Sequence, residues 1–495
     1  MAGFWIILAT SIAAAPPPAH VAVAPPQAKA QSAAPRPSAS STRLERAASA
    51  IDDGRFADAL SLSEGLANDA KISKDDVDWA AYLQARALVG LGRGEDGEAK
   101  VRDRYRDNPN GYSWAALVAI LVARGEYDKA AGEILGLKEE MLIYANRLRP
   151  SIVDTIVAGL DGKDAKLRDK VIVRLVEGRY SGPSRQRVPD LLRLRYVNLL
   201  LRERRVEDAA RQTELLEAPA MLSMLLTDRT FDALWEHPKV RALMSPGALV
   251  ARVDRGVQAQ LESQTLTSSD WLDMMRALRA IGKSGEAVRL GLHAVEQARK
   301  EKRPPGPALR LEIASAYADL GQTWAARRTA HELLREEASA PASLRIAIAD
   351  LLESSGDDEG AMLLVSAMPP TPGALKTIVC AAHDLDRTEK RDAALASLAA
   401  MAATAPAETF AAYVCAGEQA KAAEILGAMF KRPELRTSAI LTAQIYSDLS
   451  RPGSDLDDMR YRMKALVATA SVQEAIKPYA RTMALPFTIA NTGVN

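Results

Sequence analysis

Two short segments begin like metal-binding motifs, and neither completes its motif. His331-Glu332-Leu333-Leu334 starts like the H-E-x-x-H helix that holds zinc, but Arg335 stands where the second histidine belongs. Cys380 and His383 have the spacing of two ligands on one helix, and no second pair of ligands accompanies them. We therefore expect no metal site.

Phosphate-binding and catalytic motifs are also incomplete. Gly282-Lys283-Ser284 ends like a phosphate-binding loop, but Ala277 occupies the position of the first glycine. None of the 5 histidines lies in a recognised nucleophile signature. The acidic runs at residues 357–359 and 455–458 precede helical patterns, where carboxylates cap the first turn. The sequence therefore predicts no catalytic residue and no cofactor, and we expect a protein that is not an enzyme.

The chain has 2 cysteines, Cys380 and Cys415. This number excludes a disulfide-rich scaffold and a zinc site of four thiolates. If helices of neighbouring repeats stack in parallel, the two residues differ by about six positions in register, or about 9 Å. A disulfide needs Cα atoms within about 7 Å of each other. The spacing therefore predicts that both cysteines stay reduced.

Composition indicates a helical protein of balanced charge. The chain has 495 residues, with 64 Lys+Arg and 63 Asp+Glu, which argues against a strongly basic nucleic-acid binder. Hydrophobic residues make up 48%, but aromatic residues only 5%, and the Ala- and Leu-rich remainder favours helices over strands. The longest apolar run, residues 4–15, is too short for a membrane span of about 20 residues. We expect no nucleic-acid partner and no transmembrane helix in the mature chain.

The N-terminal segment resembles an export signal. An apolar stretch begins at Phe4, and Ala28-Lys29-Ala30 fits a small-residue cleavage site, so residues 1–30 are a candidate signal peptide. No Lys or Arg precedes the apolar stretch, which leaves open an upstream start, an uncleaved anchor or an ordinary apolar tail. Residues 31–43 are rich in Ala, Pro and Ser, a composition typical of a disordered tether. The expected location is periplasmic or secreted.

After Leu44 the pattern is helical, and a short element recurs at intervals of 29–40 residues within two stretches. Each copy has a turn residue, usually glycine, and an alanine five positions later. A turn glycine ends the first helix tightly, and the alanine lets the second helix cross it closely. One such pair cannot bury its apolar face alone, so the pairs are expected to stack. The copies are Gly54 with Ala59, Gly94 with Ala99, Gly125 with Ala130, Arg204 with Ala209, Gly282 with Ala287, Gly321 with Ala326, Gly356 with Ala361, Thr388 with Ala393, and Gly417 with Ala422.

This pattern resembles the tetratricopeptide repeat family. The best matches are Gly54-Arg55-Phe56 with Ala59, Gly125-Glu126-Tyr127 with Ala130, and Gly321 with Ala326. The intervals scatter around the family's period of about 34 residues, and most units lack its tryptophan. The resemblance implies an all-α superhelical solenoid of stacked antiparallel helix pairs. The expected domains are repeats over 44–218, an irregular cap or junction over 219–265, repeats over 266–480 and a tail over 481–495.

In such solenoids the first helix of each pair lines the concave surface, and that implies a set of inner positions for partner binding. These positions run from basic to acidic along the array, although ordinary solvated helix faces would give a similar pattern. Reversing Arg276 and Arg279 to Glu is expected to abolish partner capture without lowering the melting temperature. The predicted inner residues are Asn198, Arg202, Arg276, Arg279, Ser315, Asp319, Asp350, Glu353 and Asp386.

The leading hypothesis is a non-enzymatic scaffold in the cell envelope that binds a protein or peptide segment, with self-association open. An alternative is an enzyme or accessory arm of cell-wall or exopolysaccharide processing, but aromatic side chains that would stack on sugars are sparse. A third possibility is a cytoplasmic scaffold, which would follow if residues 1–30 are a mistaken extension of the chain.

Overall fold

The computed structural model describes most of the chain after residue 38. The predicted signal peptide, most of the predicted tether, Gly54 and the end of the predicted tail lie outside the described residues. The described ranges are 39–52, 55–66, 72–107, 109–182, 187–262, 266, 268–300, 305–336, 341–447 and 455–487.

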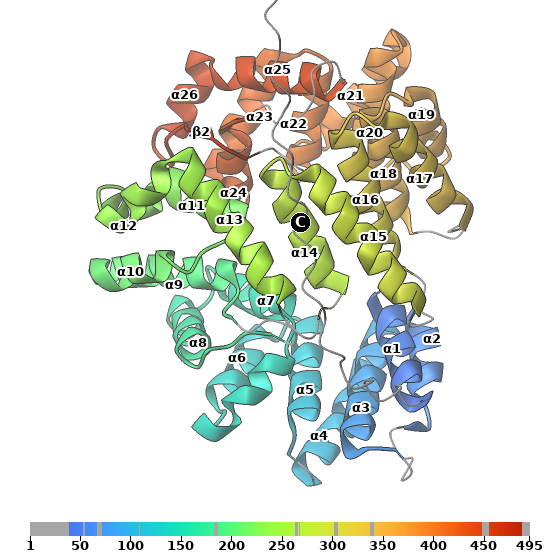
Figure 1. Cartoon of the computed structure of the whole chain (residues 1–495), viewed down its shortest axis with the longest axis vertical. Helices are drawn as coiled ribbons and strands as arrows, with labels where there is room; N and C mark the ends of the chain where they lie inside the picture. The colour runs from blue at the N-terminus through green and yellow to red at the C-terminus, as the bar shows by residue number, and fades with distance from the viewer. Residues whose placement is uncertain are drawn as a thin grey trace, which may run out of the picture.

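The described chain is almost entirely helical, and its helices pack as antiparallel pairs that follow one another through space (Figure 1). The predicted all-α superhelical repeat fold is therefore confirmed. The first array comprises α1 (Ala39–Asp52), α2 (Phe56–Ser63), α3 (Lys74–Gly90), α4 (Gly94–Asp107), α5 (Gly111–Ala123), α6 (Tyr127–Leu135), the 3₁₀ helix η2 (Glu139–Arg147), α7 (Pro150–Leu160), α8 (Ala165–Glu177), α9 (Asp190–Arg202) and α10 (Val206–Thr213).

A group of shorter elements, which we call the junction, separates this array from a second one. The junction comprises α11 (Pro219–Thr227), η3 (Arg229–Leu234), α12 (Pro238–Arg241), η4 (Ala242–Met244) and the longer α13 (Pro246–Leu261). The second array comprises α14 (Ser268–Ala280), α15 (Ser284–Lys300), α16 (Pro307–Asp319), α17 (Thr323–Glu336), α18 (Ala342–Ser354), α19 (Asp358–Ser366), α20 (Pro372–Asp384), α21 (Thr388–Ala400), α22 (Pro406–Cys415), α23 (Gln419–Lys431), α24 (Pro433–Thr442), α25 (Asp455–Val467) and α26 (Ala470–Ile476). Two short strands, β1 (Ile445–Tyr446) and β2 (Ala484–Leu485), pair in parallel near its end.

The turn between two helices of a pair has the same hydrogen-bonding pattern in most of the described pairs. At the end of α5, Gly125 has φ 74°, and its N–H donates to the Val122 carbonyl at 2.9 Å. The next N–H, of Glu126, reaches back to Leu121 at 2.9 Å, which completes a Schellman motif and satisfies the last helix carbonyls. Arg204 and Asp386 take the same left-handed conformation without being glycine, with φ 62° and 55°.

Alanines lie where the second helix of each pair begins to cross the first. Because a methyl group is all that fits there, the two backbones approach closely and the neighbouring Leu and Met side chains fill the groove. Seven of the predicted crossing alanines have no exposed surface: Ala59, Ala130, Ala209, Ala287, Ala326, Ala361 and Ala422.

The predicted turn at Gly94 is wrong by two residues. The left-handed glycine is Gly92, with φ 75°, and Gly94 already belongs to α4. The buried crossing residue is then Gly97, where an added Cβ would lie 3.3 Å from the Ala85 carbonyl oxygen, whereas Ala99 is exposed. A cluster of several glycines in this turn made the choice ambiguous.

The predicted turn at Thr388 is wrong for a related reason. Its left-handed residue is Asp386, one of the few residue types other than glycine that tolerate this conformation. The crossing position therefore falls on Arg391, and Ala393 is exposed, while the neighbouring Ala394 is buried.

The first described helix begins earlier than the predicted array. Helix α1 starts at Ala39, inside the segment 31–43 expected to be a tether. Side chains hold this turn in place: Ser40 donates to Asp76 at 3.4 Å, and Arg43 donates to the Ser61 and Glu64 carbonyls at 3.1 Å.

The prediction of two reduced cysteines is wrong, because Cys380 of α20 and Cys415 of α22 form a disulfide with Cα atoms 5.1 Å apart. The expected register difference was counted from the wrong turn at Thr388. Counted from Asp386, it falls to about four residues, or one helical turn of about 5.4 Å.

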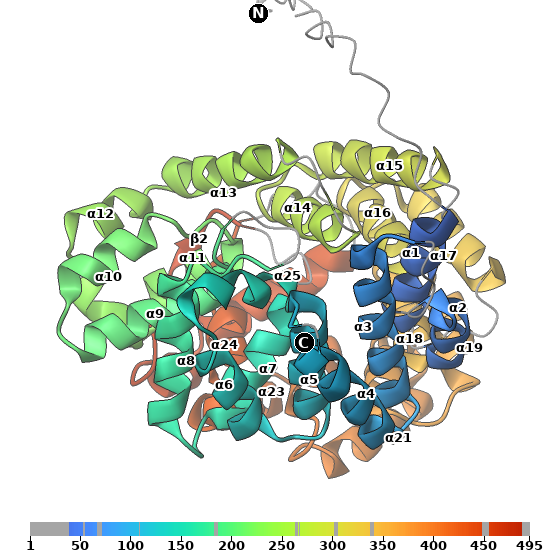
Figure 2. The ribbon, with the colours of Figure 1, turned by 90° about the horizontal axis from the view of Figure 1, so that it is seen from below.

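The end of the chain packs back on the junction. Helix α24 contacts α11, and the Arg229 N–H donates to the Tyr479 carbonyl at 2.8 Å. The Arg481 N–H donates to Thr227 at 2.9 Å, and its guanidinium lies 3.8 Å from the centre of the Trp235 ring. Figures 1 and 2 both place α11 and α12 on the same side as α9 and α10, with α13 leading away to the second array. The junction therefore joins the first array to both ends of the second. Among the described helices, none is long and apolar enough to cross a bilayer.

Candidate functional site

The predicted inner residues of α14 and α16 are joined by buried ion pairs. Arg279 is only 6% exposed, and it lies 2.5 Å from Glu312 Oε1 and 2.7 Å from Asp319 Oδ2. Burial by itself would lower the pKa of Arg279, but Asp319 and Glu312 outweigh burial and raise it. Arg276 adds a further contact to Glu312 at 3.2 Å and keeps about half of its side chain exposed.

This arrangement changes the test that the sequence suggested. Arg279 and Asp319 hold two successive first helices together, so they are internal contacts of the array. Reversing Arg279 to Glu would place a carboxylate against two buried carboxylates, and the expectation of an unchanged melting temperature fails for that residue. Arg276 remains suitable for such a test because its guanidinium reaches solvent.

A second cluster joins α18 to α20. Asp350 accepts hydrogen bonds from Lys376 Nζ at 2.6 Å and from Thr377 Oγ1 at 2.5 Å. Burial raises the pKa of Glu353 to about 8, against the opposing effect of Lys376, and Asp350 and Asp384 add to the rise. The structure thus brings Asp350 and Glu353 together around one lysine, and Glu353 is a carboxyl group that titrates close to neutral pH.

The other predicted inner residues lie apart. Ser315 donates to the Leu311 carbonyl of its own helix at 3.0 Å, and Asp386 is exposed in its turn. Asn198 is half-buried on α9, and Arg202 is exposed and pairs with Asp169 at 3.0 Å.

The incomplete metal motifs have structural roles. Cys380 is bonded to Cys415, and His383 Nε2 lies 3.1 Å from the Arg462 guanidinium of α25. His331 contacts Asp357 at 3.0 Å, and Asp357 also caps α19 by accepting from the Gly360 N–H at 3.1 Å. Within the part of the chain that the structure describes, no group of three or more potential ligands gathers around a point.

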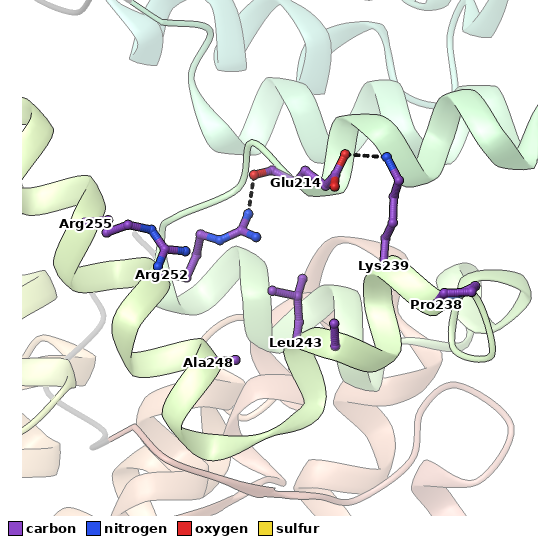
Figure 3. A pocket seen from close by; sticks show the side chains of 8 residues that line it. Glu214, Pro238, Lys239, Leu243, Ala248, Arg252 and Arg255 are labelled. Atoms are coloured by element: carbon purple, nitrogen blue, oxygen red, sulfur yellow. Dashed lines mark hydrogen bonds and ion pairs between the residues drawn. The ribbon is translucent and has the colours of Figure 1, made fainter.

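The junction contains a pocket that was not predicted, because most of its lining belongs to a segment that fits no repeat. The cavity has a volume of about 480 Å³ and lies between the end of α10 and the elements α12, η4 and α13. Figure 3 shows Arg252 and Arg255 side by side on α13, with Glu214 and Lys239 across the opening. The three-residue spacing of Arg252 and Arg255 is the one signal that could have indicated two cations on one helix face.

Glu214 contacts two of the three cationic side chains that line the pocket, Lys239 and Arg252. Lys239 Nζ lies 2.6 Å from the Glu214 carboxylate, and Arg252 Nη1 donates to the Glu214 carbonyl. Burial lowers the pKa of Arg252, and the like charge of Arg255 lowers it further. The remaining walls are Pro238, Ala242, Leu243 and Ala248.

Comparison with known proteins finds only distant matches among solved structures. The chain matches no family model and no curated protein. The pentatricopeptide repeat protein PPR10 from maize is 12% identical, over 82% of this chain and 56% of that chain, with a TM-score of 0.27. The same protein in complex with an 18-nt psaJ RNA element gives 12% identity over 81% of this chain and 76% of that chain, with a TM-score of 0.28.

A third solved structure, Naa15/Naa10 bound to HypK-THB, is 12% identical over 88% of this chain and 80% of the other, with a TM-score of 0.22. This chain spans only about half of the length of the first of these proteins. TM-scores of 0.22–0.28 assign neither a fold nor a function to this chain.

Proposed function

We propose that this chain is a non-enzymatic scaffold of the cell envelope, which binds a segment of another protein along the first helices of its second array. The observation that carries the proposal is the unbroken succession of these helices. Helix α14 contacts α16, α16 contacts α18, α18 contacts α20, and α20 contacts α22. Side chains on five neighbouring helices can therefore contact one extended partner, as helical-repeat proteins do.

Charges that reach solvent on these helices favour a partner of mixed charge. Arg276 on α14 keeps a half-exposed guanidinium, and Asp350 on α18 keeps about a quarter of its side chain exposed. Asp386, in the turn after α20, is exposed. An acidic group of the partner would then face α14, and a basic group would face α18 and α20.

The disulfide supports the proposed compartment. Structural disulfides persist in oxidising environments such as the periplasm or the extracellular space, and they are rare in the cytosol. The Cys380–Cys415 bond is buried, with 3% and 4% of the two residues exposed, so it is a structural bond of the array. An oxidising location also agrees with the export signal expected over residues 1–30.

The test is quantitative capture of partners from an envelope extract with the immobilised mature chain. Arg276→Glu should lower the yield of a specific partner several-fold, because it reverses the charge of the exposed cation on α14. The matched control is Arg289→Glu, which reverses an exposed arginine on the outer helix α15. Equal capture by the two variants, with equal melting temperatures, would refute binding along these helices.

A further inference from the structure

We propose that the pocket in the junction binds a small organic anion, with its charged group against Arg252 and Arg255 and its apolar body against Leu243. This site is separate from the second array, and the inference does not depend on the proposed partner-binding function. It rests on three features of the pocket: its excess of positive charge, its unused hydrogen-bond donors, and its size.

The charge of the lining is unbalanced. Three cations, Lys239, Arg252 and Arg255, face one carboxylate, Glu214. A second carboxylate, Glu217, does not line the pocket; it forms an ion pair with Arg187, and its charge also acts on Arg252 and Arg255. Within the described residues the lining therefore carries an excess of positive charge that an anion would neutralise.

Guanidinium donors in the pocket are unused. Arg252 bonds the Glu214 carbonyl through Nη1, but its buried Nε has no acceptor among the described residues. Arg255 is exposed, and no hydrogen bond or ion pair to a described residue occupies its guanidinium. Because guanidinium groups bind carboxylate and phosphate through paired N–H donors, these two side chains make a suitable receptor for an oxyanion.

The size and walls of the pocket indicate more than a bare ion. A volume of about 480 Å³ lies in the range of small-molecule sites, about 300–1,000 Å³, and is far larger than one phosphate. The other residues that line the pocket are apolar: Pro238, Ala242, Leu243 and Ala248. An inorganic ion would leave this part empty, whereas an aryl or alkyl group would fill it and bury apolar surface. The class of ligand is therefore an oxyanion, phosphate or carboxylate, attached to an apolar body.

The test is calorimetric titration of the mature chain with matched probes. The charged probes are 1-naphthyl phosphate and 1-naphthoate, and their relative affinities distinguish phosphate from carboxylate recognition. The controls are 1-naphthol, which has the body without the charge, and inorganic phosphate, which has the charge without the body. At least one charged probe should bind about tenfold or more tightly than both controls. Equal binding of 1-naphthol would indicate unspecific apolar adsorption, equal binding of phosphate would indicate an adventitious ion only, and binding of neither charged probe would also overturn the proposal.

Substitutions in the pocket lining, compared with one on α15, test whether the probe binds in this pocket. Arg255→Ala should weaken the preferred probe about tenfold or more and leave the melting temperature unchanged, since Arg255 makes no bond within the described protein. Arg255→Lys should recover part of the affinity, because it restores the charge without the fork of donors. Ala242→Asp, at an exposed position of the wall, should also weaken binding through charge repulsion. Arg289→Ala, on α15, is the control and should bind like the unmodified chain; a loss equal to that of Arg255→Ala would overturn the site.

Discussion

The two arrays use charge differently, although both are built from the same pairs of helices. In the first array, the central helix α5 is apolar on almost every face, and the buried carboxylate Asp78 pairs at 2.7 Å with Arg104 inside a single helix pair. In the second array, ion pairs join one helix pair to the next: a buried pair through Arg279 at α14–α16 and a partly buried pair through Lys376 at α18–α20. In the second array, buried charged residues at the predicted inner positions therefore hold neighbouring repeats together. Only the exposed charged residues at these positions can contact a partner.

The largest difference between the arrays should be the loss of stability when an arginine at a predicted inner position is replaced by alanine. Arg279→Ala leaves Glu312 and Asp319 without their buried partner and should lower the free energy of unfolding by about 3–5 kcal/mol. Arg202→Ala, at a predicted inner position of the first array, breaks an exposed pair with Asp169 and should cost less than about 1 kcal/mol. Chemical denaturation of both variants measures the difference. Similar losses would show that the two arrays do not differ in this way.

The disulfide should stabilise the second array selectively. Replacing both Cys380 and Cys415 by Ser opens a closed loop of intermediate length and should cost about 2–4 kcal/mol. Hydrogen exchange should show the loss of protection in α20 and α22, with α3 and α5 unchanged. An equal loss of hydrogen-exchange protection in both arrays would mean that they unfold as one unit. The two arrays would then have no separate stabilities to compare.

Architecture was predictable from sequence because it depends on local features repeated many times. The alanine five residues after each turn, as at Ala130 and Ala326, marks a helix crossing wherever glycine marks the turn. Prediction failed where another residue took the glycine's conformation. Asp386 in the left-handed region moved the crossing to Arg391, and the same shift of two residues hid the disulfide.

The candidate sites were less predictable because they depend on contacts between distant residues. The bond of Arg279 to Asp319 joins two helices from separate repeats, and no local pattern distinguishes it from an exposed arginine. The junction pocket brings Glu214 to Arg252 in a region without repeats, where spacing carries no information about neighbours.

Overpacking the helix crossings tests the feature that both arrays share. Ala130→Leu in the first array and Ala326→Leu in the second should each cost about 1–3 kcal/mol, because neither site has room for a larger side chain. Ala393→Leu is a matched control at an exposed position and should change stability by less than about 0.5 kcal/mol. Thermal unfolding of the three variants suffices, and a loss at Ala393 equal to that at Ala326 would contradict the corrected register.

A last prediction concerns pH. The pKa of Glu353 is raised in the folded protein from 4.5 to about 8. The protonated form is therefore favoured by folding, and its contribution to stability is complete below about pH 4.5 and is lost as the pH rises through about 8. Glu353→Gln removes this dependence, so the variant should be more stable than the unmodified chain at pH 9 and should match it closely at pH 5. Melting curves across this range are the measurement, and parallel curves for the two proteins would contradict it.

The most direct test of the scaffold proposal is site-specific photo-crosslinking of the captured partner. A photoreactive amino acid at Ser315, on the first helix α16, should form an adduct with the partner. The same residue at Leu363, which is 77% exposed on the second helix α19, should form none. Adducts at Leu363 without adducts at Ser315 would place the partner on the outer helices and contradict the account.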